Sequence, residues 1–178
     1  MMVSKYPKVC NLCGGKVEFV SNDILYGRRY GSGFAYLCTR CGAYVGTHDK
    51  GNKREALGIL SNEEMRCLKT DCHALFDAQW KGKKRTRTEC YFRLSKALKI
   101  DPKECHFGYF DISMLKRAYE LLDAYSKVKD RMDSAWKENP RKFEKARQRL
   151  IQNMFDPTAC EEALRFISEN EIEGVWVQ

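Results

Sequence analysis

Long apolar runs are missing from this 178-residue chain, and so are the common motifs of enzyme active sites. No run approaches the roughly 18 apolar residues that cross a bilayer, and the first residues, MMVSKYPKVC, lack the apolar core of a signal peptide. We therefore expect a cytoplasmic protein that does not contact a membrane. The sequence also has no Walker loop, GxGxxG, HExxH or GxSxG segment, so no motif predicts an enzyme.

Cysteine is frequent, with nine residues in the chain. A reducing compartment disfavours disulfides, and an odd number of cysteines argues against a fully paired framework. Metal binding and buried free thiols remain as the two uses of these side chains, and we expect both.

The positive charge is unevenly distributed. Residues 1–100 contain 19 Lys and Arg against nine Asp and Glu, whereas residues 101–178 contain 13 against 15. The first 100 residues therefore have a net charge of +10, and the rest of the chain a net charge of −2. This asymmetry favours a polyanion contact confined to the first 100 residues, the alternative being a surface that only keeps the protein soluble.

Two cysteine pairs with the same internal spacing stand near the N-terminus. The pattern is Cys10-x2-Cys13-x24-Cys38-x2-Cys41, and a glycine follows each pair at Gly14 and Gly42. Glycine tolerates the left-handed backbone that a knuckle turn needs. Four thiolates brought together form the closed tetrahedral shell of a structural zinc ion, so we predict one Zn²⁺ per chain.

Between the two pairs, KVEFV, DILYG and GFAYLC are short β-prone segments separated by turn residues. They predict small antiparallel hairpins, and together with the cysteines a zinc ribbon. The closed shell excludes a catalytic zinc, and a redox role would need a single CxxC in an α/β fold. His48 is an alternative fourth ligand, although such a histidine more often packs against the ribbon.

After residue 60 the apolar residues recur at helical spacing. Capping boxes are predicted at Ser61 with Glu64 and at Thr86 with Glu89. The expected fold class is α+β, an N-terminal zinc ribbon followed by a mainly α-helical part of about five helices. We divide the chain into a zinc ribbon at 1–60, a helical part at 61–122 and C-terminal helices at 123–178.

The chain resembles the family of small zinc-finger-containing proteins that are encoded largely by phages and prophages and have no assigned function. The likeness covers about residues 8–122 and rests on YLCTRCGAYVGTH, LGIL, CHALFD and CHFGYFD. The matching residues are Cys10, Cys13, Cys38, Cys41, His48, His73, Phe76, Asp77, His106 and Gly108. The resemblance implies zinc and a viral or prophage context, but it implies no reaction.

Two basic segments are candidates for contact with DNA or RNA. In LYGRRYG, Tyr26 and Tyr30 flank Arg28 and Arg29, a combination that suits stacking on unpaired bases together with backbone contact. KGKKRTR is a cluster of cations between two predicted helices, where it can neutralise phosphates. Its cations are Lys81, Lys83, Lys84, Arg85 and Arg87. The alternative for each segment is a solvated loop.

A polar cluster and four of the five other cysteines are further candidates. His73 and Asp77 are four residues apart on a predicted helix, and His106 follows in a loop. We interpret these three residues as structural, with a second metal site or general acid–base catalysis as alternatives. Cys72 and Cys90 fall on apolar faces, where a free cysteine acts as a small hydrophobe. Core packing is thus favoured over a second zinc for the group Cys67, Cys72, Cys90 and Cys105.

The sequence therefore predicts a non-enzymatic zinc-ribbon protein, of phage or prophage origin, that binds nucleic acid. One rival is a protein-binding effector that acts on a host machine through its C-terminal helices. The other is a metal-dependent hydrolase that uses His73, Asp77 and His106.

Overall fold

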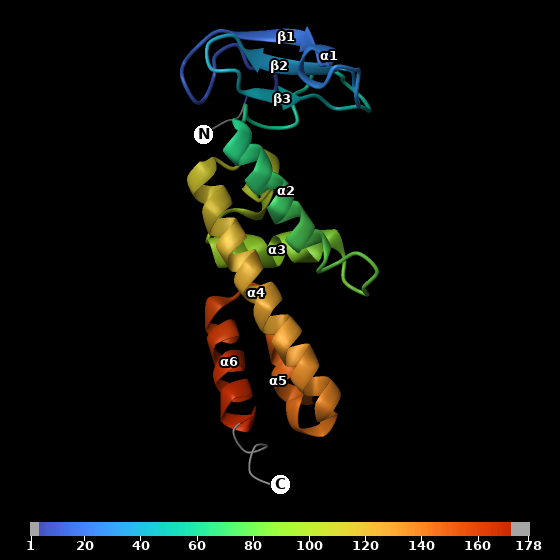
Figure 1. Ribbon diagram of the computed structural model, residues 1–178, viewed down its shortest axis with the longest axis vertical. Coiled ribbons are helices and arrows are strands. Elements are labelled where there is room, and N and C mark those ends of the chain that lie inside the picture. The colour runs from blue at the N-terminus through green and yellow to red at the C-terminus, as the bar shows by residue number, and fades with distance from the viewer. Residues whose placement is uncertain (1–3, 172–178) are drawn as a thin grey trace. The chain divides into compact units, whose positions relative to one another are not determined.

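The computed structural model describes residues 4–171 and shows a small β-sheet followed by helices, which confirms the α+β class (Figure 1). The chain forms two compact units. The first consists of the residues up to Thr70 together with His106–Leu115, and the second of Asp71–Cys105 together with the residues from Lys116 on. The predicted division at residues 60 and 122 stays a prediction.

The sheet of the first unit has three antiparallel strands in the order β1-β2-β3. The strands are β1 (Val17–Ser21), β2 (Phe34–Cys38) and β3 (Tyr44–Gly46). Cys38 is the last residue of β2 and pairs with Val17, the first residue of β1. The register therefore places the second cysteine pair at one end of the sheet, next to the segment that leads out of the first pair.

One of the predicted strands is wrong, because DILYG forms a single helical turn, α1 (Asp23–Tyr26). The buried side chain of Asn22 explains the difference. Its Nδ2 donates to the carbonyl of Tyr30 at 2.6 Å, and its Oδ1 accepts from the Tyr30 N–H at 3.2 Å. Gly27, with a φ of 69°, ends the turn. The third strand is instead β3, which follows the second cysteine pair.

The core of the ribbon is small and includes two of the cysteines. Its eight buried members are Cys10, Val17, Tyr36, Cys38, Ala43, Val45, Ala56 and Leu60. A core of this size buries little apolar area, and small domains of this kind usually need a metal or disulfides to fold. The cysteine site is therefore expected to be part of what stabilises the ribbon.

Helix α2 (Glu63–Asp77) begins one residue later than the predicted capping box requires. Asn62, rather than Ser61, is its cap, since Asn62 Oδ1 accepts from the Met65 N–H at 3.0 Å. The Ser61 hydroxyl accepts from the Lys69 ammonium group at 2.7 Å instead. The Ser61 hydroxyl also donates to the Ile59 carbonyl at 3.2 Å, so it is already engaged away from the start of α2.

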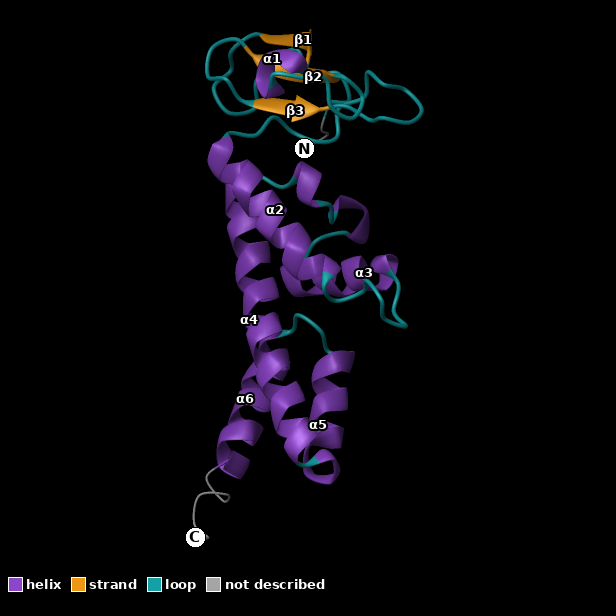
Figure 2. Cartoon of the chain, turned by 45° about the vertical axis from the view of Figure 1, so that its right-hand side comes forward, coloured by secondary structure: helices purple, strands orange, loops and turns teal. Residues whose placement is uncertain are grey.

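The remaining helices are α3 (Arg87–Leu98), α4 (Ile112–Glu138), α5 (Pro140–Gln152) and α6 (Pro157–Glu171), with two short 3-10 turns, η1 (Pro102–Glu104) and η2 (Phe107–Tyr109), before α4. Figure 2 shows this helical content in purple. The predicted capping box of α3 is confirmed, with Thr86 and Glu89 bonded reciprocally. None of the described helices has the length and hydropathy needed to cross a bilayer.

The core of the second unit is built around aromatic side chains. Phe155 lies 5.1 Å from Tyr125 and 6.5 Å from Phe76, measured between ring centroids. Phe76 in turn packs on Tyr91 at 4.3 Å. These contacts join α2, α3, α4 and the turn that connects α5 to α6. Aromatic pairs at such distances add stabilisation beyond their buried area.

Candidate zinc centre and basic surfaces

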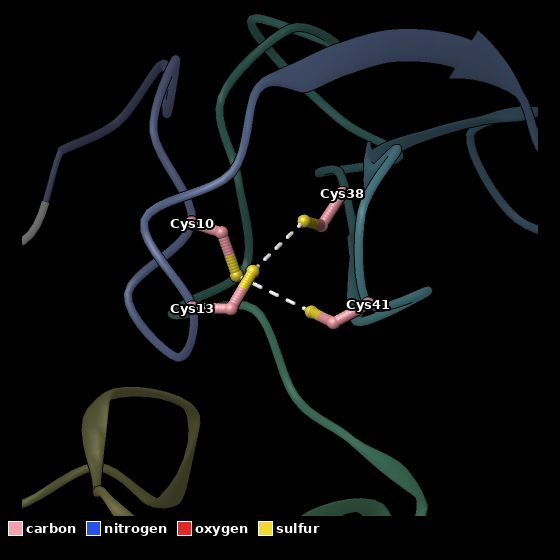
Figure 3. A group of neighbouring side chains, drawn as sticks. All are labelled: Cys10, Cys13, Cys38 and Cys41. Carbon is pink, nitrogen blue, oxygen red and sulfur yellow. Dashed lines mark hydrogen bonds between the residues drawn. The ribbon is translucent and has the colours of Figure 1, made fainter.

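The four predicted cysteines converge on one point (Figure 3). Their sulfur atoms all lie within 4.8 Å of one another. Cys10 Sγ is 3.7 Å from Cys41 Sγ, and Cys13 Sγ is 3.5 Å from Cys38 Sγ. Tetrahedral zinc with Zn–S bonds of about 2.3 Å places its sulfurs about 3.8 Å apart. The cluster therefore matches the size of a zinc–tetrathiolate shell.

The two cysteine pairs have the same local structure. In each, the N–H of the glycine after the second cysteine donates to the carbonyl of the first at 3.0 Å, from Gly14 to Cys10 and from Gly42 to Cys38. The φ angles of these glycines are 70° and 72°, which confirms the predicted left-handed conformation. Such turns aim both sulfurs of a pair inward, because the backbone reverses between them.

Gly15 leaves little room for a side chain next to the sulfurs. A Cβ at this position would lie 3.1 Å from Cys38 Sγ, 3.2 Å from Cys13 Sγ and 2.7 Å from Arg40 Cβ. Its N–H donates to Cys13 Sγ at 3.4 Å. Gly15 is therefore required by space rather than by its backbone angle, and sequence reasoning missed this role.

The pKa values of the clustered thiols are also consistent with a site that binds a cation. Backbone N–H groups of Cys41 and Arg40 lower the pKa of Cys38 to about 6, so this thiolate forms at neutral pH. The Ala43 N–H acts in the same direction on Cys41, but the neighbouring sulfurs of Cys13 and Cys38 and burial outweigh it and raise the pKa of Cys41 to about 12. Four sulfurs this close ionise together only around a positive ion. A soft dication such as Zn²⁺ supplies that charge.

This geometry defines a structural zinc module, and a comparison with protein families agrees. A family model described as a zinc-finger-containing domain, DUF3268, matches residues 6–125, about two thirds of the chain. The chain belongs to this family. Comparisons with curated proteins and with solved structures find no match. The four cysteines are thus a site for one Zn²⁺, which would tie both knuckles to the ribbon core.

His48 is not part of this centre. Among the described residues, the four cysteines are the only group of three or more potential ligands close enough to hold a metal ion. The His48 side chain is exposed, and its backbone N–H donates to the carbonyl of Glu55 at 3.0 Å. It lies in the loop that leaves the ribbon, where its backbone is hydrogen-bonded and its side chain is open to solvent.

Tyr26 and Tyr30, which the sequence predicts as contacts to nucleic acid, belong to a cluster of aromatic rings. Tyr26 lies 6.1 Å from Tyr30 and 5.9 Å from Tyr44, in edge-on contacts, and the Arg66 guanidinium lies 4.2 Å from the centre of the Tyr44 ring. We call Tyr26, Tyr30, Tyr44 and Arg66 the tyrosine surface. Tyr30 is 68% exposed and Tyr26 45%. Arg28 and Arg29 are exposed in the loop between these two tyrosines.

The sequence reasoning missed Tyr44 and Arg66. Tyr44 lies on β3 and Arg66 on α2, so only the fold brings them to the loop at residues 26–30. The Arg66 side chain is held in place, since it also donates to the Ser61 carbonyl at 2.8 Å. Burial, aided by the Tyr44 hydroxyl, raises the pKa of Tyr26 to about 12.

The cations of the second predicted segment do not act as one group. Lys81 pairs with Asp77 at 2.7 Å, and the Arg87 guanidinium lies 5.2 Å from the Tyr91 ring and donates to its hydroxyl. The other three cations, Lys83, Lys84 and Arg85, line a hollow on the surface of the second unit. Lys81 and Arg87 are also exposed, but they do not line this hollow. The role of all five cations in binding nucleic acid stays a prediction.

His73 and Asp77 lie on the part of α2 that belongs to the second unit, whereas His106 belongs to the first. Asp77 Oδ1 accepts from the Trp80 indole at 2.9 Å, and Oδ2 pairs with Lys81 at 2.7 Å. Burial acts to raise the pKa of Asp77, but the bonds from Lys81 and Trp80 and the nearby His73 outweigh it and lower that pKa. These contacts favour the structural interpretation of Asp77, as a group that ends α2.

The prediction of core packing is supported for Cys72, Cys90 and Cys105 but is wrong for Cys67. Cys72, Cys90 and Cys105 are each fully buried, and Cys67 is exposed. Burial raises the pKa of the Cys72 and Cys105 thiols to about 12. Thiols in this state are poor ligands and poor nucleophiles. No second group of metal ligands occurs in the described part of the chain.

Proposed function

We propose that the zinc ribbon binds single-stranded nucleic acid through the tyrosine surface. The observation that supports this proposal is the association of three tyrosine rings, two of them largely exposed, with the Arg66 guanidinium and the adjacent Arg28 and Arg29. Exposed aromatic rings stack on unpaired bases whatever the base, while cations contact the phosphates. The function is binding, not catalysis.

The role of zinc in this proposal is structural. The ion would hold the two knuckles and hence the ends of β1 and β2, whose other ends lie on either side of α1 and the arginine loop. Residues of the tyrosine surface come from α1, the following loop, β3 and α2, so their relative positions depend on the folded ribbon. The phage or prophage origin implied by the resemblance stays a prediction.

The test is a titration of the zinc-loaded full chain against labelled single-stranded and duplex DNA and RNA, each at two salt concentrations. Tyr30→Ala should weaken binding to single strands about tenfold, because stacking on one base contributes about 1–3 kcal/mol. The matched control is Tyr109→Ala, which removes a tyrosine that is 42% exposed on η2 of the same unit. Duplex binding should change little in either variant.

The proposal fails if the wild-type chain binds no strand at low salt, or if Tyr30→Ala has no larger effect than Tyr109→Ala. In the first case the protein-binding rival takes its place. A pull-down from host lysate with and without nuclease then identifies a partner that does not depend on nucleic acid. Activity that requires a metal and is lost in His73→Ala would instead support the hydrolase rival.

A further inference from the structure

The second unit has a surface groove that neither the zinc centre nor the tyrosine surface uses. It has a volume of about 1130 Å³ and is lined by α3, α4 and the turn between α5 and α6. A smaller hollow of about 480 Å³ shares Glu89 and Arg93 with it. Because these lining residues are shared, we treat the two as one depression and call it the basic groove.

Cations dominate its lining. Arg93, Lys96, Lys99 and Arg117 line the larger part, and Lys83, Lys84 and Arg85 line the smaller one. Seven cationic side chains thus face three acidic ones. An uneven balance of this kind concentrates positive potential in a concave surface, where field lines are focused.

Two of the three acids are committed to helix caps. Glu89 accepts from the Thr86 N–H at 2.6 Å as part of the capping box of α3. Asp156 accepts from the Thr158 N–H at 2.9 Å at the start of α6. On the cationic side, burial first and then the positive charges of Lys129 and Arg85 lower the pKa of Lys83. The groove therefore has an excess of positive charge that an anion would relieve.

An aromatic ring lies among these cations. Phe92 is 49% exposed, and it is the only exposed large apolar side chain among the described residues of the second unit. The Lys96 ammonium group lies 4.4 Å from the centre of its ring. An exposed ring with a cation beside it is the arrangement on which an unpaired base stacks while its phosphate is neutralised.

The wall opposite α3 is held in a defined shape. Phe155, in the turn between α5 and α6, has a φ of 68°, which is rare for a bulky side chain. Its buried ring packs against Tyr125 and thereby fixes this backbone. Arg93 donates to the carbonyl of Gln152 and ties α3 to the same turn. The groove is therefore formed before any ligand arrives.

We propose that the basic groove binds the sugar–phosphate backbone of a single nucleic-acid strand and that Phe92 stacks on one of its bases. The choice of ligand rests on the proposed function, but the residues are different from those of the ribbon. Seven cations spread over two adjoining hollows exceed what one mononucleotide would contact. A single exposed ring needs an unpaired base, so a strand fits better than a duplex.

The experiment uses the zinc-loaded full chain and labelled single-stranded oligonucleotides. The double variant Lys96→Gln/Arg117→Gln removes two exposed cations of the groove, and the matched control Arg141→Gln/Lys145→Gln removes two exposed cations of α5 that line neither hollow. The groove variant should bind about tenfold more weakly, and its salt slope should fall by about 1.4, or about 0.7 for each lost phosphate contact. The control should stay within twofold of wild type.

Phe92→Ala separates stacking from charge. It should weaken single-strand binding about tenfold and leave the salt slope unchanged. Ultraviolet crosslinking of a bound strand should label the peptide that contains Phe92, and at a strand concentration near the wild-type Kd this label should be several-fold weaker in the double variant. Millimolar mononucleotide should not displace the strand.

The outcomes distinguish this site from the ribbon. If Tyr30→Ala weakens binding while the groove variants match their control and no crosslink maps to α3, the groove proposal is overturned and the ribbon proposal stands. If only the groove variants weaken binding, the ribbon proposal is overturned and the groove proposal stands. If mononucleotide displaces the bound strand, the groove is a nucleotide site and the proposal of a strand-binding groove is overturned. If the wild-type chain binds no strand, both proposals are overturned.

Discussion

Gly58 and Gly108 touch backbone to backbone in the first unit. The N–H of Ile59 donates to the Gly108 carbonyl at 2.9 Å, and a Cβ on Gly58 would lie 2.0 Å from that same oxygen. The segment that leaves the ribbon and the turn η2 therefore pack at a distance that only glycine permits. Both glycines lie in segments that carry the family resemblance, LGIL and CHFGYFD.

Gly58→Ala should destabilise the first unit by about 3 kcal/mol, because the added methyl group collides with backbone that has no rotamer to change. Gly46→Ala is the control, since its Cβ would meet only Leu57 Cδ1 at 3.5 Å, an ordinary contact. Urea denaturation of the zinc-loaded chain measures both. Equal midpoints for the two variants would contradict the prediction.

Cys38→Ser should abolish stoichiometric zinc. The wild-type chain should retain one zinc per molecule after dialysis, measured by elemental analysis, and the variant close to none, since a three-thiolate site with a poor oxygen ligand holds zinc weakly. Cys67→Ser, at an exposed cysteine outside the cluster, should retain the full complement. Full occupancy in Cys38→Ser would show that another residue completes the shell.

Gly15→Ala should weaken zinc binding without removing a ligand. The new methyl group would press on Cys38 Sγ and Cys13 Sγ, at 3.1 Å and 3.2 Å, and shift them from the ion. Gly14→Ala is the matched comparison, because a Cβ there meets no atom within 4 Å and strains only the left-handed backbone. Competition with a chelator should give a larger loss of affinity for Gly15→Ala. The opposite order would contradict this account.

Because of Lys69, the free energy of unfolding of the first unit should rise as the pH is raised through the alkaline range. Burial lowers the pKa of this lysine from 10.5 to about 8, and its two acceptors, Ser61 Oγ and the Gly108 carbonyl, are uncharged. At a pH between the folded pKa of about 8 and the unfolded pKa of 10.5, the unfolded chain holds a proton that the folded chain has released. Stability therefore rises with pH in this range. The cost of burying the ammonium group is greatest below pH 8 and disappears above the unfolded value.

Lys69→Met removes the pH-dependent cost of burying the ammonium group. The difference in unfolding free energy between wild type and the variant should therefore move in favour of wild type by about 2 kcal/mol from pH 7 to pH 9.5. Taking the difference cancels the other titrating groups that both chains share. A difference that does not change with pH would mean that the buried nitrogen keeps its charge throughout.

The zinc centre could be predicted because residues close together in the sequence determine the structure of each cysteine pair. The repeated spacing of the cysteines and the glycines after them dictate two identical knuckles, and the left-handed angles of Gly14 and Gly42 follow from that. The capping box at Thr86 is equally local and is confirmed. By contrast, the prediction of a strand at DILYG is wrong because the conformation of this segment depends on Asn22 and on backbone eight residues away.

The basic surfaces were only partly predictable for the same reason. Nothing in the spacing of Tyr44 and Arg66 links them to Tyr26, since the sheet register and the start of α2 bring them together. Charge composition located Lys83, Lys84 and Arg85. It does not show that Lys81 contacts Asp77 and that Arg87 contacts Tyr91, since both contacts depend on the folded helices.

Two of the eight residues in the ribbon core, Cys10 and Cys38, are also zinc ligands. The hydrophobic centre and the metal shell are consequently the same structure, and its folding equilibrium is linked to the concentration of free zinc. While zinc exceeds its dissociation constant, each tenfold fall in free zinc removes about 1.4 kcal/mol of ribbon stability. A chain that binds through the tyrosine surface would therefore lose that ability as zinc becomes scarce, in proportion to the fraction of ribbons that unfold.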